Sequence, residues 1–159
     1  MRESTTNTEI VNSIKAAGHW AYKIPDFPQS MIAGSRFNPE KPFDIVAFIA
    51  GRAVAIEGKQ FKKYQAFGER HMRPSQLEEF NRIVDRDAGR AFVFLNIRQP
   101  RPRLNRLLIF DWKNLRERFK DGSIKMRELE AQQYLEGRKK LFNLGGFFLS
   151  IDRGCPWKW

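Results

Sequence analysis

The chain of 159 residues carries 29 Lys and Arg against 18 Asp and Glu, a formal net charge of +11, and 42% of its residues are hydrophobic. This length fits one domain, since compact domains most often contain about 100–150 residues, and the apolar content is too high for a disordered chain. The single cysteine excludes an internal disulfide and a cysteine-rich zinc site.

The sequence has neither a membrane-spanning segment nor a signal peptide. No apolar run approaches the ~18 residues that cross a bilayer, and the N-terminal stretch lacks the apolar block of an export signal. We therefore expect a soluble cytoplasmic protein without a membrane partner.

The positive charge predicts a polyanionic partner. Residues 1–96 hold 14 basic and 11 acidic side chains, whereas residues 97–159 hold 15 and 7. The densest basic stretches contain Pro, Gly and aromatic residues instead of the long basic amphipathic helix that binds membrane surfaces. Nucleic acid is therefore the expected partner.

The N-terminal segment predicts a helix followed by a strand. Thr6 and Glu9 have the spacing of a capping box, which predicts a helix over about residues 7–17 that ends at Gly18. Residues 19–24 then alternate as a half-buried strand does, with Trp20, Tyr22 and Ile24 on one side. Residues 25–42 show no period and form a long loop, of a length usually kept for function.

A tight hairpin is predicted next. Two β-prone runs, residues 43–50 and 53–59, are joined by Gly51-Arg52, which suits a type II′ turn. In that register residue 44 lies directly opposite residue 59 and diagonal to residue 57.

The rest of the chain predicts further helices and strands. The expected elements are a helix over 75–84 begun by Pro74, strands over 91–97 and 104–112, short helices over 113–119 and 125–135, and a final strand over 147–151. The order predicts an α/β fold in which helices pack on a central mixed β-sheet.

The predicted hairpin carries the candidate functional residues. Asp44, Glu57 and Lys59 project from one face, close enough for the two carboxylates to converge. Asp44 and Lys59 could form a plain surface ion pair. However, Asp44 and Glu57 both adjoin apolar runs, where a charge needs a compensating group. A hard cation such as Mg²⁺ suits oxygen ligands, and no His or Cys cluster favours a softer metal.

These motifs resemble a nuclease family. Lys41-Pro42-Phe43-Asp44 and Glu57-Gly58-Lys59, preceded by a helix with Glu9 and followed by Arg73-Pro74-Ser75-Gln76-Leu77, are similar to the PD-(D/E)xK nuclease superfamily, and within it to Holliday junction resolvases of the archaeal, phage and RecU-like type. The proline stands two places before Asp44 instead of next to it. The resemblance covers about residues 5–97. It implies a restriction-endonuclease-like core in a single nuclease domain (1–159), with a core of about 5–112 and a basic C-terminal extension of about 113–159.

The resemblance also implies a metal site. Asp44, Glu57 and the main-chain carbonyl of Gly58 would bind Mg²⁺, for which Mn²⁺ can substitute. Glu9 would complete the site directly or through water, although the capping box explains Glu9 equally well.

Two further residues receive roles from the resemblance. Lys59 would orient or deprotonate the attacking water and offset charge on the phosphate. Gln76 would lie near the scissile phosphate or order the water, unless it is an ordinary residue of the first helical turn.

Two basic groups are candidates for contacts with the DNA backbone, and a solvated charge run is the alternative for the first. The first lies beside the expected active site and the second on a proline-stiffened connection: Lys62, Lys63, Arg70 and Arg73, then Arg98, Arg101, Arg103 and Arg106. Arg36 belongs to the loop over residues 26–41, which would enter a junction centre or reach a partner subunit.

The expected function is a structure-selective, Mg²⁺-dependent endonuclease that resolves four-way DNA junctions by cutting paired strands. Two symmetric cuts imply a homodimer, which would act in a host cytoplasm if a phage encodes it. The alternatives are a repair or restriction-type nuclease of the same superfamily acting on duplex or flapped DNA, and a non-catalytic nucleic-acid-binding module.

Overall fold

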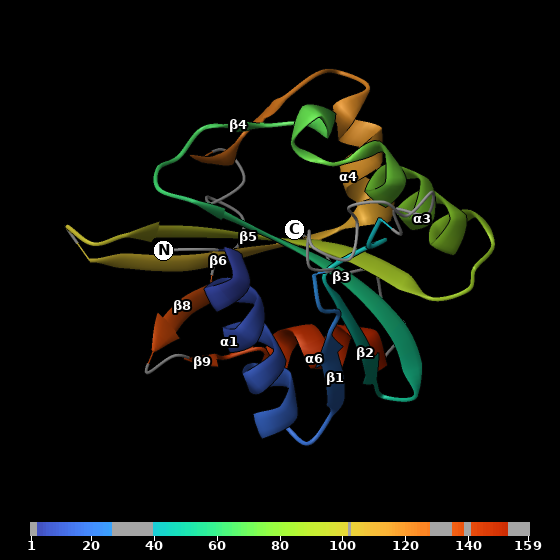
Figure 1. Cartoon of the computed structure of the whole chain (residues 1–159), viewed down its shortest axis with the longest axis horizontal. Helices are drawn as coiled ribbons and strands as arrows, with labels where there is room; N and C mark the ends of the chain where they lie inside the picture. Colours follow the sequence, from blue (N-terminus) through green and yellow to red (C-terminus); the bar gives the residue numbers. More distant parts are fainter. Residues whose placement is uncertain (1–2, 27–39, 102, 128–134, 139–140, 153–159) are drawn as a thin grey trace, which may run out of the picture.

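A computed structural model describes residues 3–26, 40–101, 103–127, 135–138 and 141–152. The strands lie in the order β1-β2-β3-β5-β6-β8-β9 (Figure 1). Their bounds are β1 Trp20–Lys23, β2 Ile45–Ile49, β3 Arg52–Phe61, β5 Arg90–Gln99, β6 Leu104–Asp111, β8 Leu135–Arg138 and β9 Leu141–Phe142. A short pair, β4 (Ala66–Phe67) and β7 (Ile124–Lys125), lies apart.

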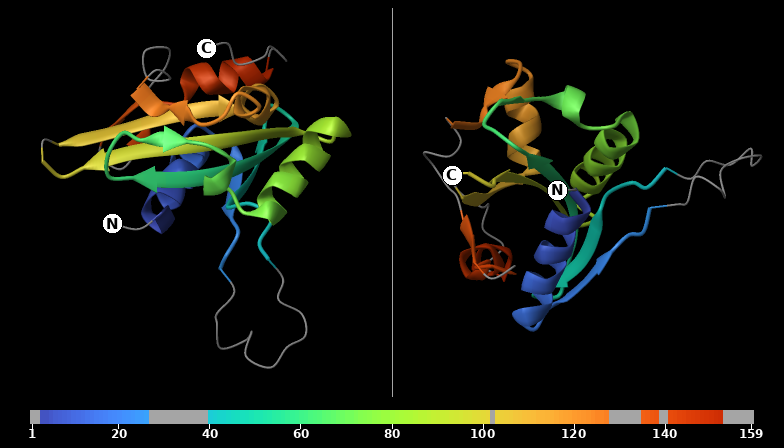
Figure 2. Two further views of the ribbon diagram at one scale, coloured as in Figure 1. Left: turned by 90° about the horizontal axis from the view of Figure 1, so that it is seen from above. Right: turned by 60° about the vertical axis from the view of Figure 1, so that its left-hand side comes forward.

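Helices cover both faces of the sheet. α3 (Pro74–Asp85) and α4 (Trp112–Phe119) lie on one face, and α1 (Glu3–Ala16) and α6 (Gly145–Asp152) lie on the other (Figures 1 and 2). A 3₁₀ turn, η1 (Glu69–His71), precedes α3. Among the helices in these residue ranges, none is both long and apolar enough to cross a membrane.

The sheet is mixed. β1, β2 and β3 pair antiparallel, β3 pairs parallel with β5, and β5 pairs antiparallel with β6. A parallel pair needs a crossover, which the segment containing α3 supplies. The predicted fold class, a mixed α/β sheet flanked by helices, is confirmed.

The first helix begins earlier than predicted. α1 starts at Glu3, so Thr6 and Glu9 lie inside it and the predicted capping box is wrong. Its predicted end is confirmed. Gly18 has a φ of +84°, its N–H donates to Lys15 O at 2.9 Å, and the next N–H donates to Ile14 O at 3.2 Å, which is a Schellman motif.

Strand β1 turns its aromatic residues to solvent. Trp20 and Tyr22 share one side, as predicted, and each is 51% exposed, while Ala21 between them is buried. Phe48, opposite Trp20 on β2, is equally exposed. The alternation identified the two faces of the strand, but it did not tell which face the helices cover.

The hairpin between β2 and β3 has a different register from the predicted one. Ile45 pairs with Ile56 and Ile49 with Arg52, so Ala50 and Gly51 form the turn, with φ values of +50° and +74°. Two positive φ values indicate a type I′ turn instead of the predicted type II′. The pairing therefore shifts by two residues, which places Asp44 beside Glu57 instead of opposite Lys59. An even shift keeps every side chain on its predicted face.

The later elements agree with the prediction in part. The helix begun by Pro74, the strands β5 and β6, and α4 are confirmed. The predicted final strand over 147–151 is wrong, because these residues belong to α6. The predicted helix over 125–135 is interrupted at both ends by β7 and β8, and residues 128–134 lie outside the described residues.

The sheet separates two hydrophobic clusters. The cluster beneath α1 and α6 contains Ile10, Ile14, Phe92 and Phe147, and Phe147 makes edge contacts with Phe92 and Phe94. The other cluster, beneath α3 and α4, contains side chains of the segment expected as an extension, among them Leu115 and Phe119. Residues after 112 therefore contribute to the core on both faces.

Candidate active site

Two carboxylates meet at a polar cavity. Asp44 and Glu57 line a cavity of about 310 Å³ where the start of β2 adjoins β3. Lys59, a half-buried residue, lines it as well. The other lining residues are Asn7, Lys23, Asp26, Lys41 and Arg73. The fold thus brings together the three hairpin residues that the sequence singled out.

Main-chain and lysine donors hold the Asp44 carboxylate. The Gly58 N–H donates to Asp44 Oδ2 at 3.1 Å, and Lys41 Nζ lies 2.7 Å from Oδ1. Lys41 also donates to Asp26 Oδ1 at 2.6 Å, so one buried ammonium joins two acids. Burial lowers the pKa of Lys41, but the hydrogen bonds to Asp26 and Asp44 outweigh it and raise the pKa above its ordinary value. Lys41 therefore stays charged beside Asp44.

Glu57 is almost fully buried, with its two oxygens in different surroundings. Lys59 Nζ lies 2.8 Å from Oε1, and Gln76 Nε2 donates to the same atom at 2.7 Å. The other oxygen, Oε2, is buried without a hydrogen-bond partner among the described residues. Burial raises the pKa of Glu57 to about 7, the negative charge of Asp44 adds to this, and Lys59 and Gln76 partly oppose it. The site thus contains a carboxylate, that of Glu57, whose negative charge is only partly balanced by its neighbours.

Gln76 links the first turn of α3 to the site. Its Oε1 accepts the Arg73 N–H at 3.0 Å at the start of the helix, and its amide nitrogen reaches Glu57. The side chain is fully buried. It therefore combines a helix-start role with a contact to Glu57 that the sequence did not predict, and its role beside the phosphate or the water stays a prediction.

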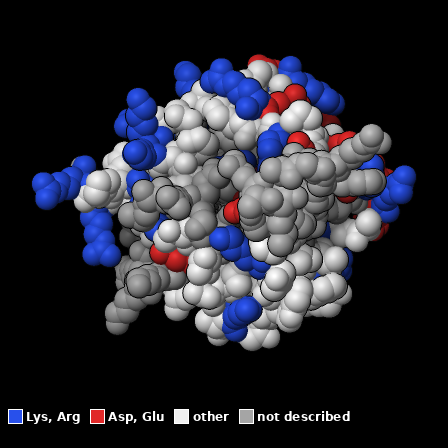
Figure 3. Space-filling model, viewed as in Figure 1, with Lys and Arg blue, Asp and Glu red and all other residues white. Residues whose placement is uncertain are grey.

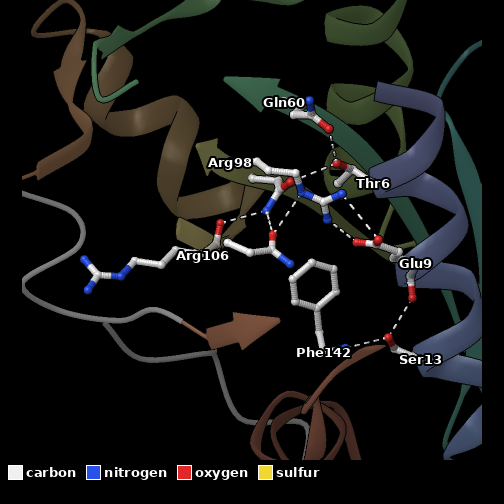
Figure 4. Close-up of polar contacts among 9 residues, drawn as sticks. Thr6, Glu9, Ser13, Gln60, Arg98, Arg106 and Phe142 are labelled. Atoms are coloured by element: carbon white, nitrogen blue, oxygen red, sulfur yellow. Dashed lines mark hydrogen bonds and ion pairs between the residues drawn. The ribbon is translucent and has the colours of Figure 1, made fainter. Parts of the chain in front are cut away.

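The structure does not bring Glu9 to this cavity. Glu9 points from α1 toward Arg98 on β5, and the two side chains form a buried ion pair (Figure 4). Thr6, one turn earlier, bonds to Gln60 and Asn96. Side chains advance about 100° per residue around a helix, so residues 7 and 9 face nearly opposite ways. Glu9 is therefore a structural partner of Arg98 in this fold.

Asn7, instead of Glu9, is the residue of α1 that lines the cavity. It is buried, and its Oδ1 has no hydrogen-bond partner in the described part of the chain. One signal in the sequence points to it: Asn7 lies on the same helical stripe as the core residues Ile10 and Ile14, where a polar side chain is unexpected. Lys41 and Asp26 also line the cavity, and the sequence did not predict them as site residues. Both stand beside Pro and Phe residues in the sequence, and that pattern gives no comparable signal.

The candidate DNA-binding residues divide into exposed ones and half-buried ones that already have partners within the fold. Arg98 pairs with Glu9, and Arg106 donates to Tyr64 at 3.1 Å. Arg36 lies outside the described residues. The exposed ones are Lys62, Lys63, Arg70, Arg73, Arg101 and Arg103. Figure 3 shows basic side chains projecting at the end of the molecule where the β5–β6 hairpin lies in Figure 1.

The donor set suits a hard divalent cation. It offers the carboxylates of Asp44 and Glu57, and Glu57 has an unpartnered buried oxygen. Oxygen ligands are those that Mg²⁺ prefers. Within the described ranges no group of three or more His, Cys, Asp or Glu residues gathers as a metal cluster.

Comparison with solved structures gives a likeness of fold. No protein-family model matches the sequence, and no curated protein matches it. Among solved structures, the chain is similar to Hjc, a Holliday junction resolvase from the archaeal hyperthermophile Archaeoglobus fulgidus. The superposition has a TM-score of 0.38 and 17% sequence identity, and it covers 75% of this chain and 92% of Hjc.

Proposed function

We propose that the protein is a Mg²⁺-dependent endonuclease that hydrolyses phosphodiester bonds in DNA. The observation that carries this proposal is the buried pair Asp44 and Glu57, with Lys59 on Glu57 and with Glu57 Oε2 left without a partner. Buried carboxylates need compensation by cations. A divalent cation at this place would neutralise both acids and bring a phosphate to them.

The residues around the cavity have separable roles. Asp44, Glu57 and the carbonyl of Gly58 would hold the cation, which supplies activation of water and neutralises charge on the phosphate. Lys59 would place an ammonium beside the attacking water and the phosphate. Gln76, which donates to Glu57 Oε1, would hold that carboxylate in place and leave Oε2 available to the cation.

The proposed substrate is branched DNA with four arms. The net charge of +11 and the exposed Arg73, Arg101 and Arg103 support binding to a polyanion. The order of motifs resembles that of Holliday junction resolvases on a restriction-endonuclease-like core. Two symmetric cuts across a four-way junction need two active sites, so we propose a two-fold homodimer.

The test compares a synthetic four-way junction with its matching linear duplex, with Mg²⁺ and with EDTA. The wild-type protein is expected to cut the junction only with Mg²⁺. Asp44→Asn and Glu57→Gln should each lose roughly 10²–10³-fold in rate, because a lost cation ligand removes several kcal/mol of transition-state stabilisation. Both variants should still bind the junction, because phosphate contacts come from Lys and Arg.

Two outcomes favour other functions. Equal cutting of junction and duplex would identify a general nuclease of the same kind, with the same carboxylates and another substrate. Mg²⁺-independent binding without any cleavage would identify a nucleic-acid-binding module whose acidic pair is structural.

A further inference from the structure

We propose that Lys41 is a positioning residue of the cation site, whose ammonium competes with the divalent cation for Asp44, while Asp26 retains that ammonium when the cation binds. This inference rests on the proposed function, because it presupposes a divalent cation at Asp44. It concerns what sets the affinity for that cation, which the roles of Asp44, Glu57 and Lys59 leave open.

Both oxygens of Asp44 are already engaged. The Gly58 N–H donates to Oδ2 at 3.1 Å, and this donor belongs to the main chain of β3. Lys41 Nζ lies 2.7 Å from Oδ1. A Mg²⁺ ion lies about 2.0–2.1 Å from its ligand oxygens, so an ion on Oδ1 and the ammonium would be neighbouring like charges. Of the two donors, the ammonium on its flexible four-carbon stem is the one that can withdraw.

Asp26 gives the ammonium a second partner. Lys41 Nζ lies 2.6 Å from Asp26 Oδ1, so one ammonium bridges the two acids. The side chain of Asp44 is 7% exposed and that of Asp26 is 74% exposed, so Lys41 connects the buried and the open side of the cavity. A shift toward Asp26 opens Asp44 Oδ1 and keeps the ammonium paired. Without Asp26, the same shift would leave a buried ammonium unpaired, which is costly.

The charges around the cavity favour such a competition. Its described lining holds four basic and three acidic side chains, so a divalent cation enters a site without an excess of negative charge. Lys41 and Lys59 already contact the two carboxylates proposed as ligands. Affinity for a divalent cation depends on the charge of the groups around it. Removing the ammonium of Lys41 should therefore tighten cation binding, whereas loss of a merely structural lysine should weaken it by disturbing Asp44.

The experiment measures Mn²⁺ binding to the full chain by electron paramagnetic resonance, without DNA. Lys41→Met keeps an unbranched side chain, and it is expected to bind Mn²⁺ about tenfold more tightly than wild type, since it removes a like charge beside the ligand. The matched control is Lys15→Met, the same substitution at an exposed position of α1. It removes the same charge outside the cavity and should change the affinity less than twofold.

A double-mutant cycle tests the role of Asp26. Asp26→Asn alone should weaken Mn²⁺ binding about threefold, because Lys41 then has Asp44 as its remaining acidic partner. In the Lys41→Met background the same substitution should change the affinity less than twofold, because no ammonium is left to retain and water screens an exposed carboxylate. A threefold loss in both backgrounds would mean that Asp26 acts on the cation directly, which contradicts its role through Lys41.

The outcomes separate this inference from the proposed function. If neither wild type nor Lys41→Met binds Mn²⁺, the proposed function itself is contradicted. If wild type binds Mn²⁺ and Lys41→Met binds it no more tightly than Lys15→Met does, the cation site stands and Lys41 does not compete for it. Circular dichroism checks the fold of each variant. Lys41→Gln, which keeps a hydrogen-bond donor without the charge, decides the question where Lys41→Met does not fold.

Discussion

The carboxyl group of Glu57 makes the stability of the fold depend on pH. Its pKa is about 7 in the folded chain, against an ordinary value of 4.5. Below pH 4.5 the group is protonated in both states, and its contribution to stability is fully present. As the pH rises through 7, the folded protein has to hold an ionised buried acid, and that contribution is lost.

The predicted size of this loss is roughly 3 kcal/mol, since each pKa unit corresponds to about 1.4 kcal/mol. In EDTA, urea unfolding of the wild type should therefore lose that much more stability between pH 4.5 and pH 8 than unfolding of Glu57→Gln. The neutral variant cancels the contributions of all other titrating groups. Equal losses in the two proteins would contradict the burial of an uncompensated Glu57.

Lys59 should act on the same titration. Its ammonium lowers the pKa of Glu57, so Lys59→Ala should move the pH midpoint of Mn²⁺ binding above that of the wild type. Lys59→Arg keeps the charge and should keep the midpoint near the wild-type value. It should not restore full cleavage, because a guanidinium is planar and very hard to deprotonate. An unchanged midpoint in Lys59→Ala would place its ammonium away from Glu57.

At the residue scale the sequence predicted that the hairpin residues converge, and it did not predict that Asn7 lies at the same cavity. Asp44, Glu57 and Lys59 were found because strand alternation assigns faces, and a register error of two residues leaves the faces unchanged. The resemblance placed Glu9 at the cation site, and the alternative, a capping box, is wrong because the helix starts four residues earlier. The face that Asn7 occupies depends on tertiary packing, which only its place on an apolar stripe hinted at.

Among the elements, α1 is tied to the sheet by the pair of Glu9 and Arg98. Both side chains are about nine-tenths buried, and Arg98 also donates to Asn105 at 3.2 Å. Arg98→Met should destabilise the protein by about 3 kcal/mol, because it leaves a buried acid without its partner. Adding Glu9→Leu should restore much of that stability. Urea unfolding of the single and double variants measures both effects.

The same pair gives a catalytic test. Glu9→Gln should keep the cleavage rate of wild type once corrected for the folded fraction, because Glu9 faces Arg98 and not the cavity. A folded Glu9→Gln protein without activity would return Glu9 to the cation site.

Predictability varied among the elements for local reasons. The helix α3 was predictable because Pro74 marks its start and its apolar residues recur at helical spacing. The segment that forms α6 was predicted as a strand because a short apolar run fits a buried strand as well as a buried helix. The hairpin turn was misassigned because Ala50 adopts a left-handed φ, which alanine rarely does.

For the whole molecule, exposure predicts which arginines bind DNA. The exposed Arg101 and Arg103 are expected to do so, whereas Arg98 already has a partner within the fold. Replacing Arg101 and Arg103 by Gln should reduce the slope of log affinity against log salt by roughly 1.8, at about 0.9 per phosphate contact. The control is Arg82→Gln on α3, whose guanidinium already contacts Glu78 and Glu79. Filter binding over a range of salt concentrations gives the slopes. An unchanged slope in the double variant would place the β5–β6 hairpin away from DNA.

The cluster beneath α1 and α6 has a consequence for synthesis on the ribosome. Ile10 and Ile14 come from α1, and Phe147 and Ile151 come from a segment made more than 130 residues later. The cluster beneath α3 and α4 lacks α1 and α6, so it can pack before that segment exists. The layer that holds Asn7 closes only once residue 151 has left the exit tunnel. The layer beneath α1 and α6 is therefore among the last parts of a newly made chain to take shape.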